Sequence, residues 1–124
     1  MEFKVLALGR KSVTRRVSDA LADSNVSITV QSNYSDAIRL LQKERFDLSL
    51  VDSHLDNLQS TCDRITWQCR VPVVVIVNGK ETDWSILKTM DIDGFIPVEA
   101  GNAEILAYFN SIARRQSRGS SSAS

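Results

Sequence analysis

A single aspartate directly follows an apolar run near the middle of the chain. Residues 46–55 read FDLSLVDSHL, in which the run ends at Val51 and Asp52 takes the next position. His54, the one histidine of the sequence, lies two residues further on. A carboxylate in such a place is a candidate nucleophile or metal ligand, and it is equally a candidate turn residue or ion-pair partner.

Few other groups in the sequence could do chemistry. Residues 10–16 read RKSVTRR, a basic cluster that is either a docking or phosphate-binding patch at a helix N-terminus or the solvated face of a helix. Cys62 and Cys69 lack the CxxC spacing of a zinc site, so we interpret them as buried or half-buried thiols of a cytosolic protein. Without a GxGxxG or GxxxxGK[ST] loop or a defensible Ser-His-Asp set, the chain is not expected to be an enzyme.

Charge balance and length limit the class of protein. Fifteen Lys or Arg residues are matched by fifteen Asp or Glu residues, so no net charge draws the chain to nucleic acid or anionic lipid. The sequence has no span of about 18 apolar residues and no cleavable signal, which predicts a cytoplasmic protein without a membrane segment. At 124 residues it fits one domain that can bury a core.

Apolar runs of strand length alternate with segments of helical periodicity. The runs lie at 3–8, 26–30, 47–51, 71–77 and 93–98. Helical spacing follows at 12–24, 35–46, 58–70, from about 81–83 to 90, and at 102–115. The predicted N-caps are Ser12, either Ser35 or Asp36, and Asn102. The run VPVVVIV is continuous and β-branched, which is typical of a parallel strand covered on both faces.

Five strand-helix alternations imply right-handed βαβ crossovers and therefore an α/β fold. We predict a doubly wound, five-stranded parallel sheet with helices on both faces. Function in such sheets lies outside the carboxyl ends of the strands, where Asp52 is expected. The domain is predicted to span residues 1–115, with the polar, Ser-rich residues 116–124 as a flexible tail or a linker.

The order of the elements, Asp52 at the end of the third strand, the VPVVVIV fourth strand and the DGFIPV fifth strand together resemble the receiver domain of two-component response regulators, the CheY-like family. The resemblance covers residues 3–115 and implies a flavodoxin-like fold. It also implies that Asp52 stands where the family accepts a phosphoryl group from a histidine kinase. His54 would line the same rim, either with a phosphorelay or metal role or as a loop residue facing solvent.

The helper residues that the resemblance implies are missing. The acidic pair that holds Mg2+ after the first strand is replaced by Gly9 and Arg10. The switch Thr or Ser is replaced by Val77, or by Asn78 after a one-residue slip, and the phosphate-pairing Lys is replaced by Val98. We therefore expect Mg2+ binding to be weak or absent and predict no cofactor.

These departures favour a pseudo-receiver, which retains the fold and signals by binding proteins. In this hypothesis Arg10 or Lys11 reaches toward Asp52 and supplies the positive charge that Mg2+ otherwise provides. The alternative is a functional receiver phosphorylated at Asp52 by a histidine kinase, with a metal held by Asp52, Asp56 and backbone carbonyls. A third hypothesis is a module of flavodoxin-like fold that binds a small ligand at the strand ends.

Trp84 and Tyr108, on the predicted fourth and fifth helices, mark a candidate docking surface. The resemblance implies it, because the fourth helix, fifth strand and fifth helix form the usual docking and dimerisation face of receivers, and large amphipathic rings are enriched at interfaces. The alternative is that Trp84 packs against the sheet. The expected partners are a histidine kinase, a downstream output domain or a second copy of the chain, with no nucleic acid and no membrane.

Overall fold

The chain folds around a five-stranded, all-parallel sheet with the strand order β2-β1-β3-β4-β5. The computed structural model describes residues 3–80 and 82–122. The strands are β1 (Phe3–Leu8), β2 (Val26–Gln31), β3 (Leu48–Asp52), β4 (Val73–Val77) and β5 (Gly94–Pro97). The helices are α1 (Lys11–Ala20), α2 (Tyr34–Lys43), α3 (Leu58–Arg64), the π-helical turn η1 (Ile65–Cys69), α4 (Trp84–Leu87) and α5 (Asn102–Ser122). The predicted doubly wound α/β architecture is confirmed.

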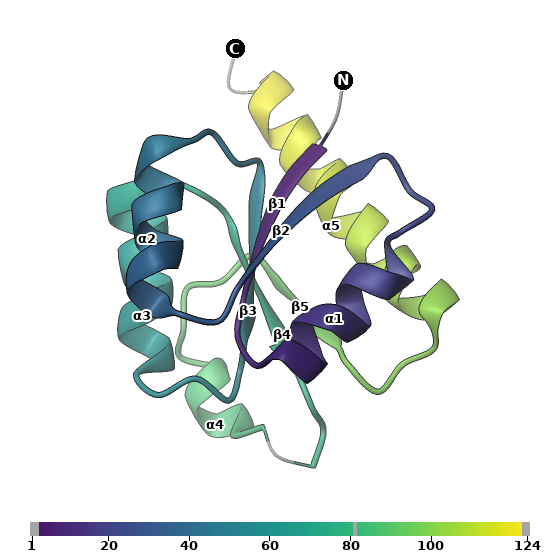
Figure 1. Cartoon of the computed structure of the whole chain (residues 1–124), viewed down its shortest axis with the longest axis horizontal. Helices are drawn as coiled ribbons and strands as arrows, with labels where there is room; N and C mark the ends of the chain where they lie inside the picture. The colour runs from purple at the N-terminus through teal and green to yellow at the C-terminus, as the bar shows by residue number, and fades with distance from the viewer. Residues whose placement is uncertain (1–2, 81, 123–124) are drawn as a thin grey trace.

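Helices cover both faces of the sheet, with α2 and α3 on one side and α1 and α5 on the other (Figure 1). Each face has its own core, because successive side chains of a strand point to opposite faces. In β4, Val75 and Val77 pack on the α2 side, whereas Val74 and Ile76 pack on the α1 side. All residues of β3 and β4 are buried, and Asp52 is the one charged residue among them.

The starts of the first two helices differ from the predicted ones. The N-cap of α1 is Arg10, and Ser12 lies inside the first turn. The N-cap of α2 is Asn33, whose side chain accepts a hydrogen bond from the Asp36 amide at 3.1 Å. The prediction of Ser12, and of Ser35 or Asp36, was therefore wrong. Asn is as good a cap as Ser, and the place of Arg10 is decided by contacts with a distant strand.

The third and fourth helices differ from those that the apolar spacing of the sequence predicts. The segment predicted as one helix over 58–70 is α3 continued by the π-helical η1, and it ends at Arg70, whose φ is 56°. Helix α4 is a single turn, although the apolar residues of the sequence continue at intervals of three to Met90. Its cap is Asp83, whose carboxylate accepts from the Ser85 amide at 3.1 Å. Glu81, within the predicted start of this helix, lies outside the described residues.

Helix α5 runs past the predicted domain end at residue 115 and reaches Ser122. Its first residue is Asn102, so the prediction of Asn102 as the cap was one position off, and the Ile105 amide donates to the Gly101 carbonyl at 2.9 Å. The sheet-facing side chains are Ile105, Phe109 and Ile112. The backbone of residues 116–122 is helical, whereas residues 123–124 lie outside the described part; the division into domain and tail stays a prediction.

Both cysteines are free thiols, Cys62 buried and Cys69 half-buried, as the sequence predicts. Burial and, to a smaller extent, the charge of Asp63 raise the pKa of the Cys62 thiol to about 12. A thiol with so high a pKa stays protonated at neutral pH. We conclude that Cys62 serves as a small apolar side chain of the core.

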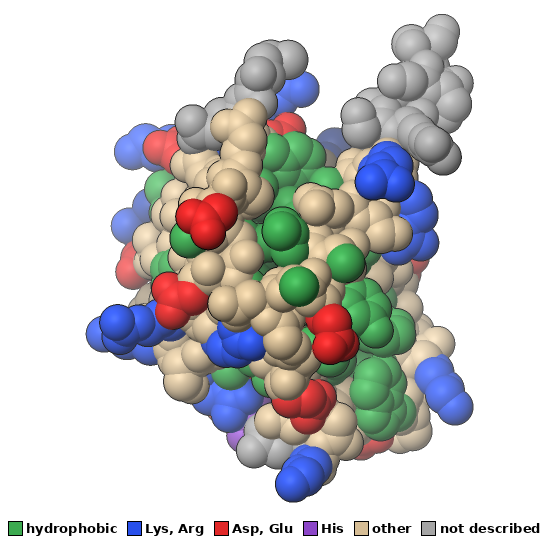
Figure 2. All heavy atoms as spheres, turned by 90° about the vertical axis from the view of Figure 1, so that its right-hand side faces the viewer, with side chains coloured by type: hydrophobic (Ala, Val, Ile, Leu, Met, Phe, Trp, Pro, Cys, Tyr) green, Lys and Arg blue, Asp and Glu red, His purple; other side chains and the backbone are tan. Residues whose placement is uncertain are grey.

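Charges of both signs are interspersed with hydrophobic side chains on the side of the molecule that carries α1 and α5 (Figure 2). This mixture agrees with the formal net charge of zero. Within residues 3–80 and 82–122, none of the helices combines the length and the apolar character needed to cross a bilayer.

Candidate functional site

The register of the sheet brings the end of β1 beside the end of β3. Leu8 lies opposite Val51, so the residues that follow β1, Gly9 and Arg10, come next to Asp52. From β1 the chain continues to β2 on one side, and from β3 it continues to β4 on the other side. This is the topological switch point, where doubly wound sheets bind their ligands. We refer to Gly9, Arg10, Asp52 and the backbone of His54 as the Asp52 pocket.

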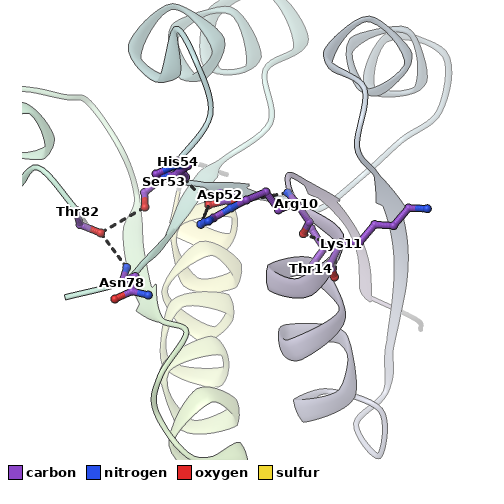
Figure 3. Close-up of polar contacts among 8 residues, drawn as sticks. All are labelled: Arg10, Lys11, Thr14, Asp52, Ser53, His54, Asn78 and Thr82. Atoms are coloured by element: carbon purple, nitrogen blue, oxygen red, sulfur yellow. Dashed lines mark hydrogen bonds and ion pairs between the residues drawn. The ribbon is translucent and has the colours of Figure 1, made fainter. Parts of the chain in front are cut away.

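The carboxylate of Asp52 is 1% exposed and accepts four hydrogen bonds. Oδ2 accepts from the Arg10 backbone N–H at 3.1 Å and from Arg10 Nε at 2.8 Å. Oδ1 accepts from Arg10 Nη2 at 3.2 Å and from the His54 backbone N–H at 3.0 Å (Figure 3). The guanidinium thus contacts both oxygens in fork geometry. Because an ionised carboxylate offers about four acceptor sites, its capacity is filled.

The Asp52 pocket keeps its carboxylate ionised in spite of burial. Desolvation by itself would raise the pKa of Asp52, because the charged form loses its water. The hydrogen bonds from the Arg10 side chain, from the His54 and Arg10 amides, and the guanidinium charge outweigh this effect and hold the pKa below its usual value. The ion pair is therefore intact at neutral pH.

Arg10 is anchored at its backbone as well as at its guanidinium. As the N-cap of α1, its carbonyl accepts from the amides of Val13 at 3.1 Å and Thr14 at 3.0 Å. The hydroxyl of Thr14 also donates to this carbonyl at 3.2 Å. Lys11, the other cation considered from the sequence, points away from Asp52 (Figure 3). The Arg10 side chain retains 41% exposure, so the pair has one solvated side.

Gly9 allows the two strands to approach each other so closely. Its φ is +153°, a conformation that residues with a Cβ rarely adopt. A Cβ built at this position would lie 2.2 Å from the Cβ of Asp52. The position therefore has no room for any side chain, including the carboxylate that a metal site would need.

The predicted switch and lysine positions, Val77 and Val98, carry apolar side chains that pack on the two faces of the sheet. Val77 is 2% exposed and packs on the α2 side of the sheet, while Val98 packs on the α1 side. Their backbones pair, with the Val98 amide donating to the Val77 carbonyl at 2.8 Å. Asn78 folds onto its own loop, where its Oδ1 accepts from the Lys80 amide at 3.1 Å. None of these contacts involves Asp52.

Two hydroxyl groups beside this region, those of Ser53 and Thr82, were not predicted from the sequence to belong to the site. Thr82 Oγ1 accepts from the Asn78 amide at 2.8 Å and shares a hydrogen bond with Ser53 Oγ at 3.3 Å (Figure 3). This chain ties the loop before α4 to the residue after Asp52. The Asn-Gly turn at residues 78–79 is a local signal, but the Ser53 contact spans 29 positions, for which the sequence has no pattern.

The residues of the Asp52 pocket do not fit a magnesium ion. A hard cation needs several free oxygen ligands, whereas both oxygens of Asp52 already accept from Arg10 and His54. Among the described residues, no three His, Cys, Asp or Glu side chains are grouped so that they could hold a metal. The side chain of His54 is exposed on the rim, and it is the backbone of this residue that contacts Asp52.

A second region carries the two aromatic residues singled out in the sequence. Trp84 and Tyr108 line one groove of about 540 Å³ between α4, β5 and α5, which we call the α4-β5-α5 groove. Phe95 of β5, not predicted from the sequence, meets Trp84 edge to face at 5.5 Å. These three rings are 39%, 43% and 46% exposed for Trp84, Tyr108 and Phe95. Trp84 packs on Phe95 and remains accessible, and its role in docking stays a prediction.

Solved structures with this architecture are numerous, although neither models of protein families nor curated proteins match the chain. The signal receiver domain of an HD domain-containing protein from Pseudomonas fluorescens superposes with a TM-score of 0.83 at 14% identity, covering 97% of this chain and 93% of that one. The chemotaxis response regulator CheY4 of Vibrio cholerae gives 0.76 at 19% identity, covering 90% and 99%. The chain has the receiver fold.

A two-component response regulator from Clostridium difficile adds a further match to the receiver fold, with a TM-score of 0.75, 21% identity and coverage of 92% and 98%. The likeness extends over nearly the whole of both chains in each pair. At these identities it establishes the fold. The chemistry of the receiver fold in this chain must be argued from its own pocket.

Proposed function

We propose that this chain is a pseudo-receiver, a protein-interaction module of two-component-type signalling whose Asp52 is an ion-pair partner and not a phosphoacceptor. The observation that carries the proposal is the fork of Arg10 on both oxygens of a buried Asp52. This contact supports the pseudo-receiver over the functional receiver, because the arginine occupies the position that the metal and the phosphoryl group would need.

The chemistry of phosphorylation gives the physical reason. A carboxylate oxygen must present a lone pair to phosphorus, and a metal or fixed cation must neutralise the phosphoryl oxygens as charge develops there. In the Asp52 pocket the lone pairs are engaged, and the nearby cation already neutralises the nucleophile itself. Val77 and Val98 offer neither a hydroxyl nor an ammonium group. Each of these features opposes the transfer.

The proposed output is the binding of a protein partner. The exposed Trp84, Phe95 and Tyr108 support docking at the α4-β5-α5 groove, since aromatic residues are enriched among interface anchors. We propose that the partner is a kinase, an output domain or a second copy of the chain, met in the cytoplasm. The Asp52 pocket then serves to fix the loops around it in one arrangement.

The experiment that tests the proposal is an amide NMR titration of the chain with Mg2+ and then with beryllofluoride, an analogue of the phosphoryl group. We expect the amides of Arg10, Asp52 and Asn78 to stay unchanged at millimolar Mg2+ and after beryllofluoride. The control is Asp52→Asn, which removes the carboxylate and should give the same null result.

Saturable shifts of these amides in the wild type, lost in Asp52→Asn, would overturn the proposal. Such a result would favour the functional receiver, because it would mean that Arg10 leaves the carboxylate when a metal and a phosphoryl mimic arrive. A shift in both proteins would report binding elsewhere on the surface and would leave the carboxylate uninvolved, as proposed.

A further inference from the structure

The floor of the α4-β5-α5 groove is an open strand edge. In the sheet order β5 has β4 as its one neighbour, so its other edge pairs with no strand of the described residues. The Asp93 amide donates to the Val73 carbonyl at 2.8 Å, toward β4. Because consecutive residues of a strand direct their backbone groups to opposite edges, those of Gly94 and Ile96 face the open one. Such an edge is a template for another strand.

The short α4 leaves this edge accessible. With one helical turn, α4 contributes Trp84 and Leu87 to one wall of the groove, and its C-cap Lys88 adds to it. Helix α5 contributes Tyr108 and Arg115 to the other wall. Gly94 lies on the floor, where a Cβ would meet the Ile112 side chain of α5 at 2.9 Å. The volume of about 540 Å³ is in the range of pockets that hold small ligands or short peptide segments.

The groove carries an excess of positive charge. Lys88 and Arg115 are exposed, and within the described residues neither makes a salt bridge. Asp93, the one acidic lining residue in the described part of the chain, is already engaged, with Oδ2 accepting from the Val73 amide at 2.8 Å and Oδ1 from Gln116 Nε2 at 3.2 Å. An occupant with carboxylates would therefore meet two cations that form no salt bridge with a described acidic residue.

We propose that β5 accepts an extended, acidic segment of a partner protein as a sixth strand of the sheet. The segment would pair its backbone with Gly94 and Ile96, insert an apolar side chain between Trp84 and Tyr108, and place carboxylates on Lys88 and Arg115. This is β-strand addition, in which main-chain hydrogen bonds give affinity and side-chain pockets give specificity. The inference rests on the proposed function, since it names the mode and the chemistry of the partner.

A second copy of the chain fits the groove less well than an acidic segment. In a two-fold pairing of two β5 edges, each copy would bring the same lysine and arginine to the interface, where like charges repel. A foreign acidic strand instead brings carboxylates to Lys88 and Arg115, where opposite charges attract.

The test begins with a random 12-residue peptide library displayed on phage and selected against the full 124-residue chain. We expect enrichment of sequences that alternate Asp or Glu with Val, Ile or Tyr. The best synthetic peptide is then titrated into the labelled chain, where the amides of Gly94, Phe95 and Ile96 should shift. A version methylated at alternate backbone nitrogens should bind at least about tenfold more weakly, because it loses strand hydrogen bonds.

Charge variants complete the test. Lys88→Glu with Arg115→Glu should weaken the peptide about tenfold or more, whereas Arg114→Glu, an exposed α5 residue outside the groove, should not. The proposal is overturned if no acidic sequences are enriched, if N-methylation has no effect, if the peptide binds as a helix, or if the double variant binds normally. Adding beryllofluoride to the same sample reads the Asp52 pocket separately, so failure of strand addition and failure of the pseudo-receiver proposal give different spectra.

Discussion

The Asp52 pocket and the α4-β5-α5 groove differ in how the polar groups of one sheet find hydrogen-bond partners. The pocket lies at the carboxyl end of the central strand β3, and the groove lies along the outer strand β5. In the pocket, a buried carboxylate has its four hydrogen bonds supplied from within the chain. In the groove, a strand edge and two cations are left without partners among the described residues. Polar groups that are satisfied internally have little left to offer a ligand, whereas unsatisfied groups at a surface can gain by binding.

The two regions also differ in what surrounds them. The pocket is enclosed by a close strand approach at Gly9 and by the N-cap of α1. The groove is open beside the single helical turn of α4. The difference teaches that the hydrogen-bonding capacity left to an acidic residue at a strand end has to be counted before a chemical role is assigned to it.

The most severe way to break the pocket is Gly9→Ala. The added Cβ would meet the Cβ of Asp52 at 2.2 Å, and the backbone φ of +153° disfavours any side chain. We expect a loss of about 3 kcal/mol or more in the free energy of unfolding, measured by urea denaturation. The matched control is Gly101→Ala, which meets no atom within 4 Å and should change stability by less than about 0.5 kcal/mol. Equal stability of the two variants would refute the steric argument.

A smaller loss is expected when the ion pair itself is removed by Arg10→Ala. The variant leaves Asp52 buried with its two backbone donors, and removing a charged hydrogen-bond partner of a buried group costs about 1–3 kcal/mol. Urea denaturation at neutral pH would measure this loss. Arg15→Ala, on the exposed face of α1, serves as the control and should be close to neutral. If Arg10→Ala behaved like Arg15→Ala, the pair would contribute nothing to stability.

The pocket should also make stability depend on acid pH. Because the pKa of Asp52 is lower in the folded chain than in the unfolded chain, its stabilising effect is fully present above the unfolded pKa of about 3.9. It is lost as the pH falls through the folded pKa, when the proton displaces the ion pair. Urea denaturation from pH 6 down to pH 3 should therefore give a steeper decline for the wild type than for Asp52→Asn. Parallel curves would contradict a lowered pKa.

The smallest effect on stability is expected in the groove, with Trp84→Ala. The edge-to-face contact with Phe95 contributes about 0.5–1.5 kcal/mol, and most of this should appear as a small drop in thermal stability. Trp67→Ala is the matched control, because Trp67 on η1 is 69% exposed and lies outside the groove. A loss of several kcal/mol at Trp84 would mean that the groove is part of the core and not a surface for partners.

Periodicity predicted the sheet and most helices well because their burial is regular. The VVVIV run became β4 with every residue buried, and the helical stripe of α5 placed Phe109 on the sheet. The caps were predicted less well. Arg10 is held at the start of α1 by its hydrogen bond to Asp52, 42 positions away, and local sequence patterns do not reveal such a contact. The one-turn α4 also departs from its pattern, in which Trp84, Leu87 and Met90 suggested a longer helix.

The candidate site was predictable in its residue types and not in its geometry. The resemblance to receivers implied that Gly9 and Arg10 stand beside Asp52, and it was left open whether Arg10 or Lys11 forms the pair. The direction of the Arg10 side chain depends on the backbone at the end of β1, where Gly9 has a φ of +153° and lies against Asp52. Phe95, Lys88 and Arg115 were not predicted to line the groove, because they come together only when α4, β5 and α5 pack.

The closeness of Gly9 to Asp52 also bears on the engineering of this sequence. Exchanging the glycine for aspartate, the most direct change toward an acidic pair, would place a side chain in space already filled by the residue it is meant to assist. The loop after β1 would have to be rebuilt first, by several simultaneous changes. A single substitution could therefore not introduce an acidic pair on this backbone, and a designer would have to begin with the loop.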